Sequence, residues 1–142
     1  MANVIPFAFS GELFSESHNF SSGGNACKIA LYTSNPYTTS STAYDTTNEV
    51  SASGGSNYTA GGESLGSQAV ASSTAVASVD FADATWSSAT FTAAFAAIYN
   101  DTNSDKLCVV LDFGGNKTAT NGTFKITFPD PATPANAIIS MA

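Results

Sequence analysis

The sequence predicts an all-β protein, an antiparallel β-sandwich or a jelly-roll-like barrel of seven or eight short strands with a short N-terminal helix or arm. Serine and threonine make up about a quarter of the chain, whereas leucine is scarce and no long charged helical face occurs. Apolar side chains alternate with small or polar ones, which is the period of a strand. Turn-forming residues interrupt these stretches at short intervals, so short strands must bury their apolar faces against one another.

The length of 142 residues fits one domain, which would bury roughly two-thirds of the surface of the unfolded chain. We assign residues 1–20 to an N-terminal arm or short helix and residues 21–142 to a single β-sandwich domain. In the arm, apolar side chains are spaced as on one side of a helix, with Ser10 as the expected cap. They are Phe7, Phe9, Leu13, Phe14 and Phe20. These side chains either close the domain's own core or dock onto a neighbouring chain.

The first predicted strand begins at Cys27, where apolar and other residues alternate as far as Tyr32. We expect it to be half-buried and to be followed by an exposed Ser/Thr-rich loop over residues 33–50. Residues 51–56 should form a flexible loop tip. Residues 75–81 show the same alternation and predict a second half-buried strand.

A third strand is predicted over residues 84–95, with Trp86 as a packing centre. The apolar register changes after Trp86, which indicates a bulge or turn at Ser87 and Ser88. Apolar residues 94–99 and 106–113 flank the polar residues 100–105 and therefore predict a hairpin. Its inner face should carry Leu107, Val109, Leu111 and Phe113.

The C-terminal part should hold two more strands. Gly114 and Gly115 should end the preceding strand, and residues 123–128 should form the next, with Phe124, Ile126 and Phe128 inward. Three prolines then enforce an extended break. They are Pro129, Pro131 and Pro134. Residues 137–141 form the last predicted strand.

The charge content argues against nucleic acid as a partner. The chain carries four lysines, no arginine and a formal charge of −7, and the lysines are scattered singly, whereas phosphate contacts need clustered basic residues. This acidity favours solubility, or attraction to a basic partner surface. No apolar run approaches the ~20 residues of a membrane span, so we expect no membrane partner. The first twenty residues lack the pattern of a secretory signal, which favours synthesis in a cytoplasm.

The two cysteines and the single histidine give little support to catalysis. Cys27 and Cys108 lie in apolar, strand-like surroundings and are expected to be reduced and buried, with a disulfide as the alternative. His18 could orient Ser15 or Ser17 as a nucleophile, but no nucleophile elbow accompanies it, so we expect a surface or capping histidine. We predict no catalytic residue and no enzyme.

No metal or cofactor site is expected. Residues 101–105 have oxygen ligands at alternate positions, as at the start of a calcium loop, but Lys106 stands where such a loop needs glycine. The Gly-Gly steps lack the spacing of a phosphate loop and are better explained as turns.

Tyrosines of the loop region are the other candidate site. Tyr32, Tyr37, Tyr44 and Tyr58 should be at least partly exposed. They could stack on carbohydrate, although tyrosine also suits strand surfaces and subunit contacts. Our candidate partner-binding residues are therefore Phe7, Phe9, Phe14, Tyr37, Tyr44 and Tyr58.

The order of several motifs is more specific than the composition. These motifs are KIALYT, AYDTTNEV, YTAGGESL, DFADATWSSATFTA, AAIYNDT, VVLDFGG, FKITFP and NAIISM. In this order they resemble a family of small structural proteins of tailed bacteriophages, over about residue 17 to the C-terminus. Family members often carry a basic residue before a His-Asn-Phe-like step, whereas residues 9–16 here are acidic and aromatic.

The resemblance implies a non-enzymatic capsid decoration (cement) protein, which binds the outer shell and stabilises junctions of the major capsid protein. Its expected partners are the major capsid protein and further copies of itself in a homo-oligomer, for example a trimer. It would be made in the host bacterial cytoplasm and reside on the capsid surface of the virion. The alternatives are a tail fibre or baseplate component, or a carbohydrate-binding module on the virion surface that uses Tyr37, Tyr44, Tyr58 or Trp86.

Overall fold

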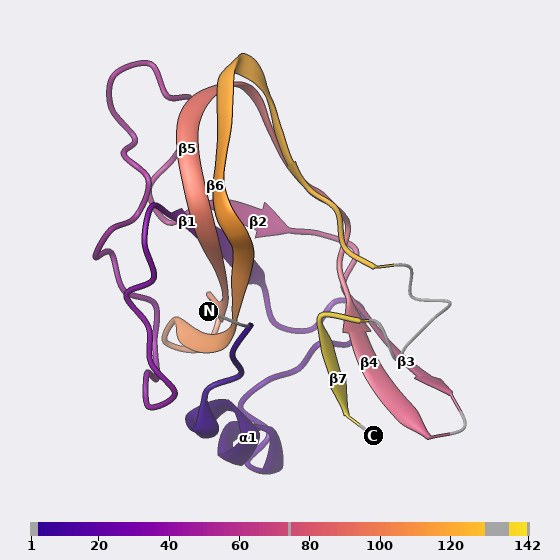
Figure 1. The fold of residues 1–142 in the computed structure, drawn as a ribbon. Helices are drawn as coiled ribbons and strands as arrows, with labels where there is room; N and C mark the ends of the chain where they lie inside the picture. Colours follow the sequence, from indigo (N-terminus) through magenta and orange to yellow (C-terminus); the bar gives the residue numbers. More distant parts are fainter. Residues whose placement is uncertain (1–2, 74, 130–136, 142) are drawn as a thin grey trace.

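The computed structural model describes residues 3–73, 75–129 and 137–141. Two antiparallel sheets and one short helix make up the described part, so the predicted all-β fold is confirmed as a sandwich-like arrangement and not as a closed barrel (Figure 1). The elements are α1 (Phe7–Phe14), β1 (Cys27–Tyr32), β2 (Glu63–Leu65), β3 (Ala69–Ser73), β4 (Val76–Asp80), β5 (Ala84–Asn100), β6 (Lys106–Ile126) and β7 (Ile139–Met141). One sheet has the strand order β2-β1-β5-β6, and the other has the order β3-β4-β7.

The long hairpin of β5 and β6 is the spine of the molecule. Its turn lies at residues 101–105, within the predicted loop 100–105, because Asn100 still belongs to β5. Its pairing extends from Asn100 opposite Lys106 to Ala84 opposite Ile126. The hairpin leaves the four-stranded sheet, bends over and descends beside the three-stranded sheet (Figure 1). The same two strands therefore form part of the four-stranded sheet at one end and lie beside the three-stranded sheet at the other.

Bulges allow this hairpin to bend. The predicted bulge after Trp86 is confirmed, because the register shifts between Trp86 and Ala89, and Ser88 has a φ of 51°. The prediction that Gly114 and Gly115 end a strand is wrong, since β6 continues through both. Their φ values of 73° and 139° suit residues without a Cβ, so the chain can form a bulge at the two glycines and then resume its pairing with β5.

A further bulge at Cys108 changes which side chains share a face. Ile98 pairs with Val109 while Tyr99 pairs with Leu107, which leaves Cys108 as the additional residue. Leu107 therefore packs on the opposite face of the sheet from Val109, contrary to the single inner face that we predicted.

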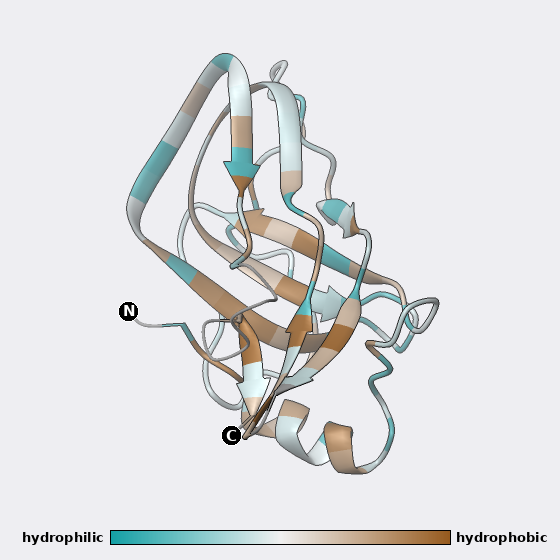
Figure 2. Cartoon of the chain, turned by 90° about the vertical axis from the view of Figure 1, so that its right-hand side faces the viewer, coloured by the Kyte–Doolittle hydropathy of each residue, from teal (hydrophilic) through white to brown (hydrophobic). Residues whose placement is uncertain are grey.

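The main core lies between the two sheets, and Trp86 is buried there as predicted. A second buried cluster on the other face of the four-stranded sheet includes Tyr32, Tyr37 and Leu107. Strand β1 is thus buried on both faces, and not half-buried as predicted, because the loop after it covers the outer face. Figure 2 shows hydrophobic residues gathered in the strands of the lower part and hydrophilic ones along the bend of the hairpin.

The other strand predictions are confirmed in part. Strands β4 and β7 lie within the predicted ranges 75–81 and 137–141, whereas β2 and β3 were not predicted. Alternation is imperfect in β4, since Ala77 is exposed and Ser78 is buried. Residues 123–126 of the predicted strand 123–128 form the end of β6, and the three expected inward residues are buried. Pro131 and Pro134 lie outside the described residues.

The predicted N-terminal helix is confirmed as α1, but Ser10 is not its cap. Ser10 lies inside the helix, and the preceding Pro6 has an extended backbone and makes no side-chain cap hydrogen bond. Before the helix, Val4 pairs with Val110 of β6 through two backbone hydrogen bonds of 2.9 and 2.8 Å. Among the described residues, no helix is long and apolar enough to cross a membrane.

Candidate functional site

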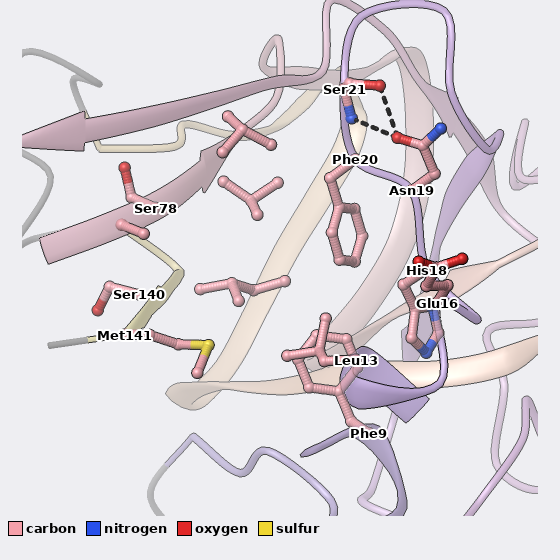
Figure 3. Close-up of a pocket in the computed structure, with 14 residues that line it drawn as sticks. Phe9, Leu13, Glu16, His18, Asn19, Phe20, Ser21, Ser78, Ser140 and Met141 are labelled. Atoms are coloured by element: carbon pink, nitrogen blue, oxygen red, sulfur yellow. Dashed lines mark hydrogen bonds between the residues drawn. The ribbon is translucent and has the colours of Figure 1, made fainter. Parts of the chain in front are cut away.

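A groove opens between α1 and the three-stranded sheet (Figure 3). Its volume is ≈ 540 Å³, and most of its lining is apolar. The apolar lining residues are Phe9, Leu13, Phe20, Val70, Ala77, Val79, Ile139 and Met141. Figure 3 shows Phe9, Leu13 and Phe20 on one side and Met141 on the other.

The register of the sheet explains why this groove is apolar. Val79 of β4 pairs with Val70 on one side and with Ile139 on the other, so the three side chains lie on one face. Val79 and Ile139 are buried, whereas Val70 and Met141 are each 57% exposed. The middle of this sheet face is therefore packed into the main core, whereas its edges remain exposed.

Helix α1 is apolar on two sides. Phe9 is buried and Leu13 packs against the main core, whereas Phe7 and Phe14 are 75% and 87% exposed. Phe7, Gly11 and Phe14 follow the i, i+4, i+7 spacing of a helical stripe, and all three are exposed. We call this stripe the outer face of α1. An added Cβ at Gly11 would meet nothing within 4 Å, so the centre of this face is open.

The predicted aromatic residues of the arm thus divide into two groups. Phe9 closes the core of its own chain, which is one of the two alternatives, and is not exposed for a partner. Phe7 and Phe14 remain predicted partner contacts, and their exposure is compatible with that role.

The predicted partial exposure of the tyrosines is confirmed for Tyr44 and is wrong for the other three. Tyr37 and Tyr58 are 5% and 3% exposed, Tyr32 is fully buried, and Tyr44 is half-buried. The rings of Tyr37, Tyr44 and Tyr58 cover β1 or β5 while their hydroxyls bond to polar groups of the loop, which is how tyrosine is usually accommodated in a core. These side chains fasten the loop over residues 33–62 to the sheet.

Glu49 is the centre of this fastening. Its Oε2 accepts the Tyr44 hydroxyl proton at 2.6 Å, and its Oε1 accepts from the Tyr58 hydroxyl and the Gly61 N–H, both at 2.7 Å. Burial and the Glu49 carboxylate raise the pKa values of Tyr44 and Tyr58. The role of Glu49 was not predicted from the sequence, although it is one of only two carboxylates in a loop that carries three tyrosines.

A second group of hydroxyls closes the loop nearer to β1. The Tyr32 and Tyr37 hydroxyl oxygens are 2.6 Å apart, and Tyr32 also donates to the carbonyl of Asp45 at 2.8 Å. The Asp45 N–H in turn donates to the Tyr37 hydroxyl at 2.9 Å. Both tyrosines therefore have structural partners within this chain.

His18 is buried, so the expectation of a surface or capping histidine is wrong. Its Nε2 lies 2.9 Å from Oε2 of Glu12, and its Nδ1 lies 3.0 Å from Nδ2 of Asn100. The ring is stacked against Phe20 at a centroid distance of 5.7 Å, and Phe9 lies 4.9 Å away. His18 is thus a structural link between the arm and the turn of the hairpin.

The arrangement around His18 does not match a serine nucleophile. Ser15 and Ser17 lie 3.1 Å apart and bond to each other, while both ring nitrogens of His18 face Glu12 and Asn100. Cys108 Sγ is 3.8 Å from Nδ1, but burial raises the pKa of its thiol well above the ordinary range. A buried neutral thiol is a poor nucleophile.

Ion pairs reinforce the same region. Lys106 Nζ donates to Oε1 of Glu12 at 2.7 Å, so this carboxylate accepts from Lys106 and from His18. Burial opposes ionisation of Glu12, but these two donors prevail and hold its pKa below the ordinary value. Lys28 pairs with Asp101 at 3.1 Å at the start of the hairpin turn.

Both cysteines are free and buried, as predicted. In the part of the chain that the structure describes, no group of three or more His, Cys, Asp or Glu side chains could hold a metal ion. Asp101 and Thr102 take part in contacts of the hairpin turn, where the Thr102 hydroxyl accepts from the Ala26 N–H at 2.8 Å.

The fold and the groove define an all-β sandwich that presents the exposed outer face of α1 and an apolar groove between α1 and the three-stranded sheet. No protein-family model, curated protein or solved structure matches this chain.

Proposed function

We propose that this chain is a non-enzymatic structural protein of a tailed-bacteriophage virion, a capsid decoration protein that binds the outer shell at junctions of the major capsid protein. The succession of motifs from KIALYT to NAIISM suggests the family. The observation that carries the docking role is the outer face of α1, where Phe7 and Phe14 are 75% and 87% exposed beside an apolar groove. Exposed apolar patches of this kind mark interaction sites.

Burial of this face would supply the binding energy. Fully burying one phenylalanine contributes roughly 1.5–3 kcal/mol, so Phe7 and Phe14 together can anchor a contact of the usual ~800 Å² per partner. Binding only to the assembled lattice shifts the equilibrium away from disassembly by mass action. In a homo-oligomer such as a trimer, simultaneous contacts raise the avidity although each contact is weak.

Charge would guide the approach. Lys28, Lys106 and Lys125 each pair with a carboxylate of this chain, which leaves the field of the molecule acidic. A basic rim around an apolar pocket on the shell would complement the outer face of α1. Binding should therefore weaken as the salt concentration rises, because exposed charges are screened over a Debye length of about 10 Å at 0.1 M.

Cosedimentation with capsid shells stripped of accessory proteins tests the proposal. The wild-type chain should sediment with shells, and the double variant Phe7→Ser/Phe14→Ser should stay in the supernatant. The matched control is Thr120→Ser/Thr123→Ser, which changes exposed residues at the far end of the hairpin and should bind like the wild type. Failure of the wild type to bind shells at any salt concentration would contradict a decoration role.

Purified tails serve as the second target and address the alternative of a tail fibre or baseplate component. Binding to tails and not to shells would favour that alternative. A glycan array addresses the carbohydrate-binding alternative, for which Trp86, Tyr37 and Tyr58 are poorly placed because they are buried.

A further inference from the structure

The three-stranded sheet ends at β3, and this edge differs from the other strand edges of the molecule. In the part of the chain that the structure describes, β3 pairs with β4 alone (Figure 1). The other side of such an edge strand presents unpaired N–H and C=O groups at alternate residues. We propose that β3 is an interaction surface whose partner is β3 of a second copy of this chain, paired antiparallel across a two-fold axis. This pairing is a property of the isolated chain and does not depend on binding to a capsid.

The edges of the four-stranded sheet are protected. Natural sheets protect their edges with charged residues, prolines, bulges, short strands or covering segments. Strand β6 contains three lysines and several register shifts, and Val4 and Ala43 pair with it from outside the sheet. The opposite edge strand, β2, has only three residues and carries Glu63. The described edges of that sheet are therefore short, charged or covered.

Within the described structure, β3 has none of these protections. Its five residues, AVASS, include no charge and no proline, and its pairing with β4 runs from Ala69 to Ser73 without a register shift. The sequence from Gly66 to Val79 contains no charged residue, although the whole chain carries a formal charge of −7. Two copies can therefore approach along this edge without the repulsion that their net charge causes elsewhere.

The length of β3 determines the register of the pair. Antiparallel pairing of all five residues places Ala71 opposite Ala71 of the second copy, and Val70 opposite Ser72 of the second copy. No charged side chain of β3 then faces another across the axis. The contact is isologous, because the same strand contributes from both sides, and it is complete with two copies. It therefore specifies a dimer.

Side chains on the groove side of the sheet supply the apolar part of the contact. Val70 is 57% exposed although it pairs with the buried Val79, which in turn pairs with the buried Ile139. A second copy would bring its own Val70 diagonally opposite and would partly shield both side chains from water. The two three-stranded sheets would then form one sheet with a continuous apolar row.

Contacts within the chain hold this edge in position. Gln68, just before β3, donates through Nε2 to the carbonyl oxygens of Ser21 and Asn19 at 3.0 and 3.4 Å. Strand β4, which pairs with β3, packs Val79 into the main core. The strand is thus ordered before it pairs, which lowers the entropy cost of association.

Sedimentation velocity of the isolated full-length chain between about 5 and 500 µM tests the proposal. A five-residue strand pair buries less than the ~800 Å² per partner of a standard interface, so we expect a weak dimer with a dissociation constant of about 100 µM. Ala71→Glu and Ala71→Lys each place two like charges opposite each other at the axis and should weaken association by about tenfold or more. An equal mixture of the two variants should associate at least as well as the wild type, because opposite charges then meet.

Two controls separate this contact from other routes to association. Thr120→Glu and Thr120→Lys change an exposed residue at the far end of the hairpin and should associate like the wild type. Phe7→Ser/Phe14→Ser should also associate like the wild type, because the outer face of α1 takes no part. A monomeric wild type at ~500 µM would overturn the proposal and leave a strand of a different protein as the occupant. Undiminished association of both Ala71 variants, or a monomeric mixture, would also overturn it.

If the charged variants do not fold, cysteine cross-linking decides the question. Under oxidised glutathione, Ala71→Cys should form a disulfide-linked dimer, whereas Ala69→Cys, which does not face itself in this register, should not. The two natural cysteines are buried and should not interfere. An Ala71→Cys chain that stays monomeric would overturn the proposal. These readouts use no capsid shells, so failure of β3 pairing and failure of the decoration role are distinguishable.

Discussion

At the scale of single residues, Gly62 shows how closely the tyrosine-bearing loop approaches β1. Its φ is +78°, and a Cβ at this position would overlap the carbonyl oxygen of Ile29. We expect Gly62→Ala to lower the free energy of unfolding by about 3 kcal/mol or more, because a left-handed backbone and a backbone clash act together. Urea denaturation measures the change.

Gly55→Ala is the matched control for this prediction. Gly55 has a φ of +74° but an added Cβ would meet nothing within 4 Å. This variant should lose only the conformational part, about 1 kcal/mol. Equal losses in the two variants would show that the close approach of Gly62 to β1 is not important for stability.

The hydrogen bonds of Glu49 should also contribute to the stability of the fold. In Glu49→Ala, two tyrosine hydroxyls and the Gly61 N–H lose their acceptor in a partly buried place, so the free energy of unfolding should fall by about 2–4 kcal/mol. Glu49→Gln keeps the shape and one acceptor oxygen and should lose less. Thermal denaturation of both variants measures the order, and an alanine variant as stable as the wild type would contradict the fastening role.

The burial of the loop tyrosines could not be predicted from the residues alone. The loop is rich in serine and threonine, and this composition indicates exposure on average. Burial of Tyr37 and Tyr58 depends on contacts with β1, Asp45 and Glu49, which are brought together only when the loop folds back over the sheet. By contrast, the burial of Trp86 was predictable because it lies within an apolar strand pattern.

At the scale of elements, the two faces of α1 should have different roles. The buried face should stabilise the fold, and the outer face should bind the partner. Phe9→Ala removes a buried ring and should lower the free energy of unfolding by about 3–5 kcal/mol, whereas Phe7→Ala should stay within about 0.5 kcal/mol of the wild type. Urea denaturation of the two variants gives the comparison. A large loss in Phe7→Ala would mean that the outer face of α1 is packed within the chain and is not a free docking surface.

The strands show which elements the sequence could predict. Period-two alternation located β1, β4 and the start of the long hairpin, because each has a buried face. The alternation could not predict that β6 continues past Gly114 and Gly115, since a glycine pair fits a strand end and a bulge equally well. Only pairing with the continuous β5 decides between them. Strand β3 was missed because its AVASS sequence is mostly small residues.

At the scale of the whole molecule, several ionisable groups are kept neutral by the core. Burial raises the pKa of the Cys27 thiol to about 11, and the pKa values of Cys108 and of the buried tyrosines are also raised. The outcome is a chain whose surface is acidic and whose interior resists ionisation. Its stability should therefore fall as the pH rises on the alkaline side.

The sign of this effect follows from the protons bound in each state. Above about pH 9 the unfolded chain loses the Cys27 proton while the folded chain keeps it until about pH 11, so the folded state binds more protons over this range. The stabilisation that Cys27 gives is complete below pH 9 and is lost as the pH rises to about 11.

We expect the free energy of unfolding to fall by about 2–3 kcal/mol over this window from Cys27 alone. Urea denaturation between pH 7 and pH 11 measures the decline, and Cys27→Ala should show a shallower one, because the tyrosines and Cys108 still contribute. An identical decline in Cys27→Ala would show that this thiol ionises equally easily in both states, and that its surroundings in the core are more hydrated than the structure indicates.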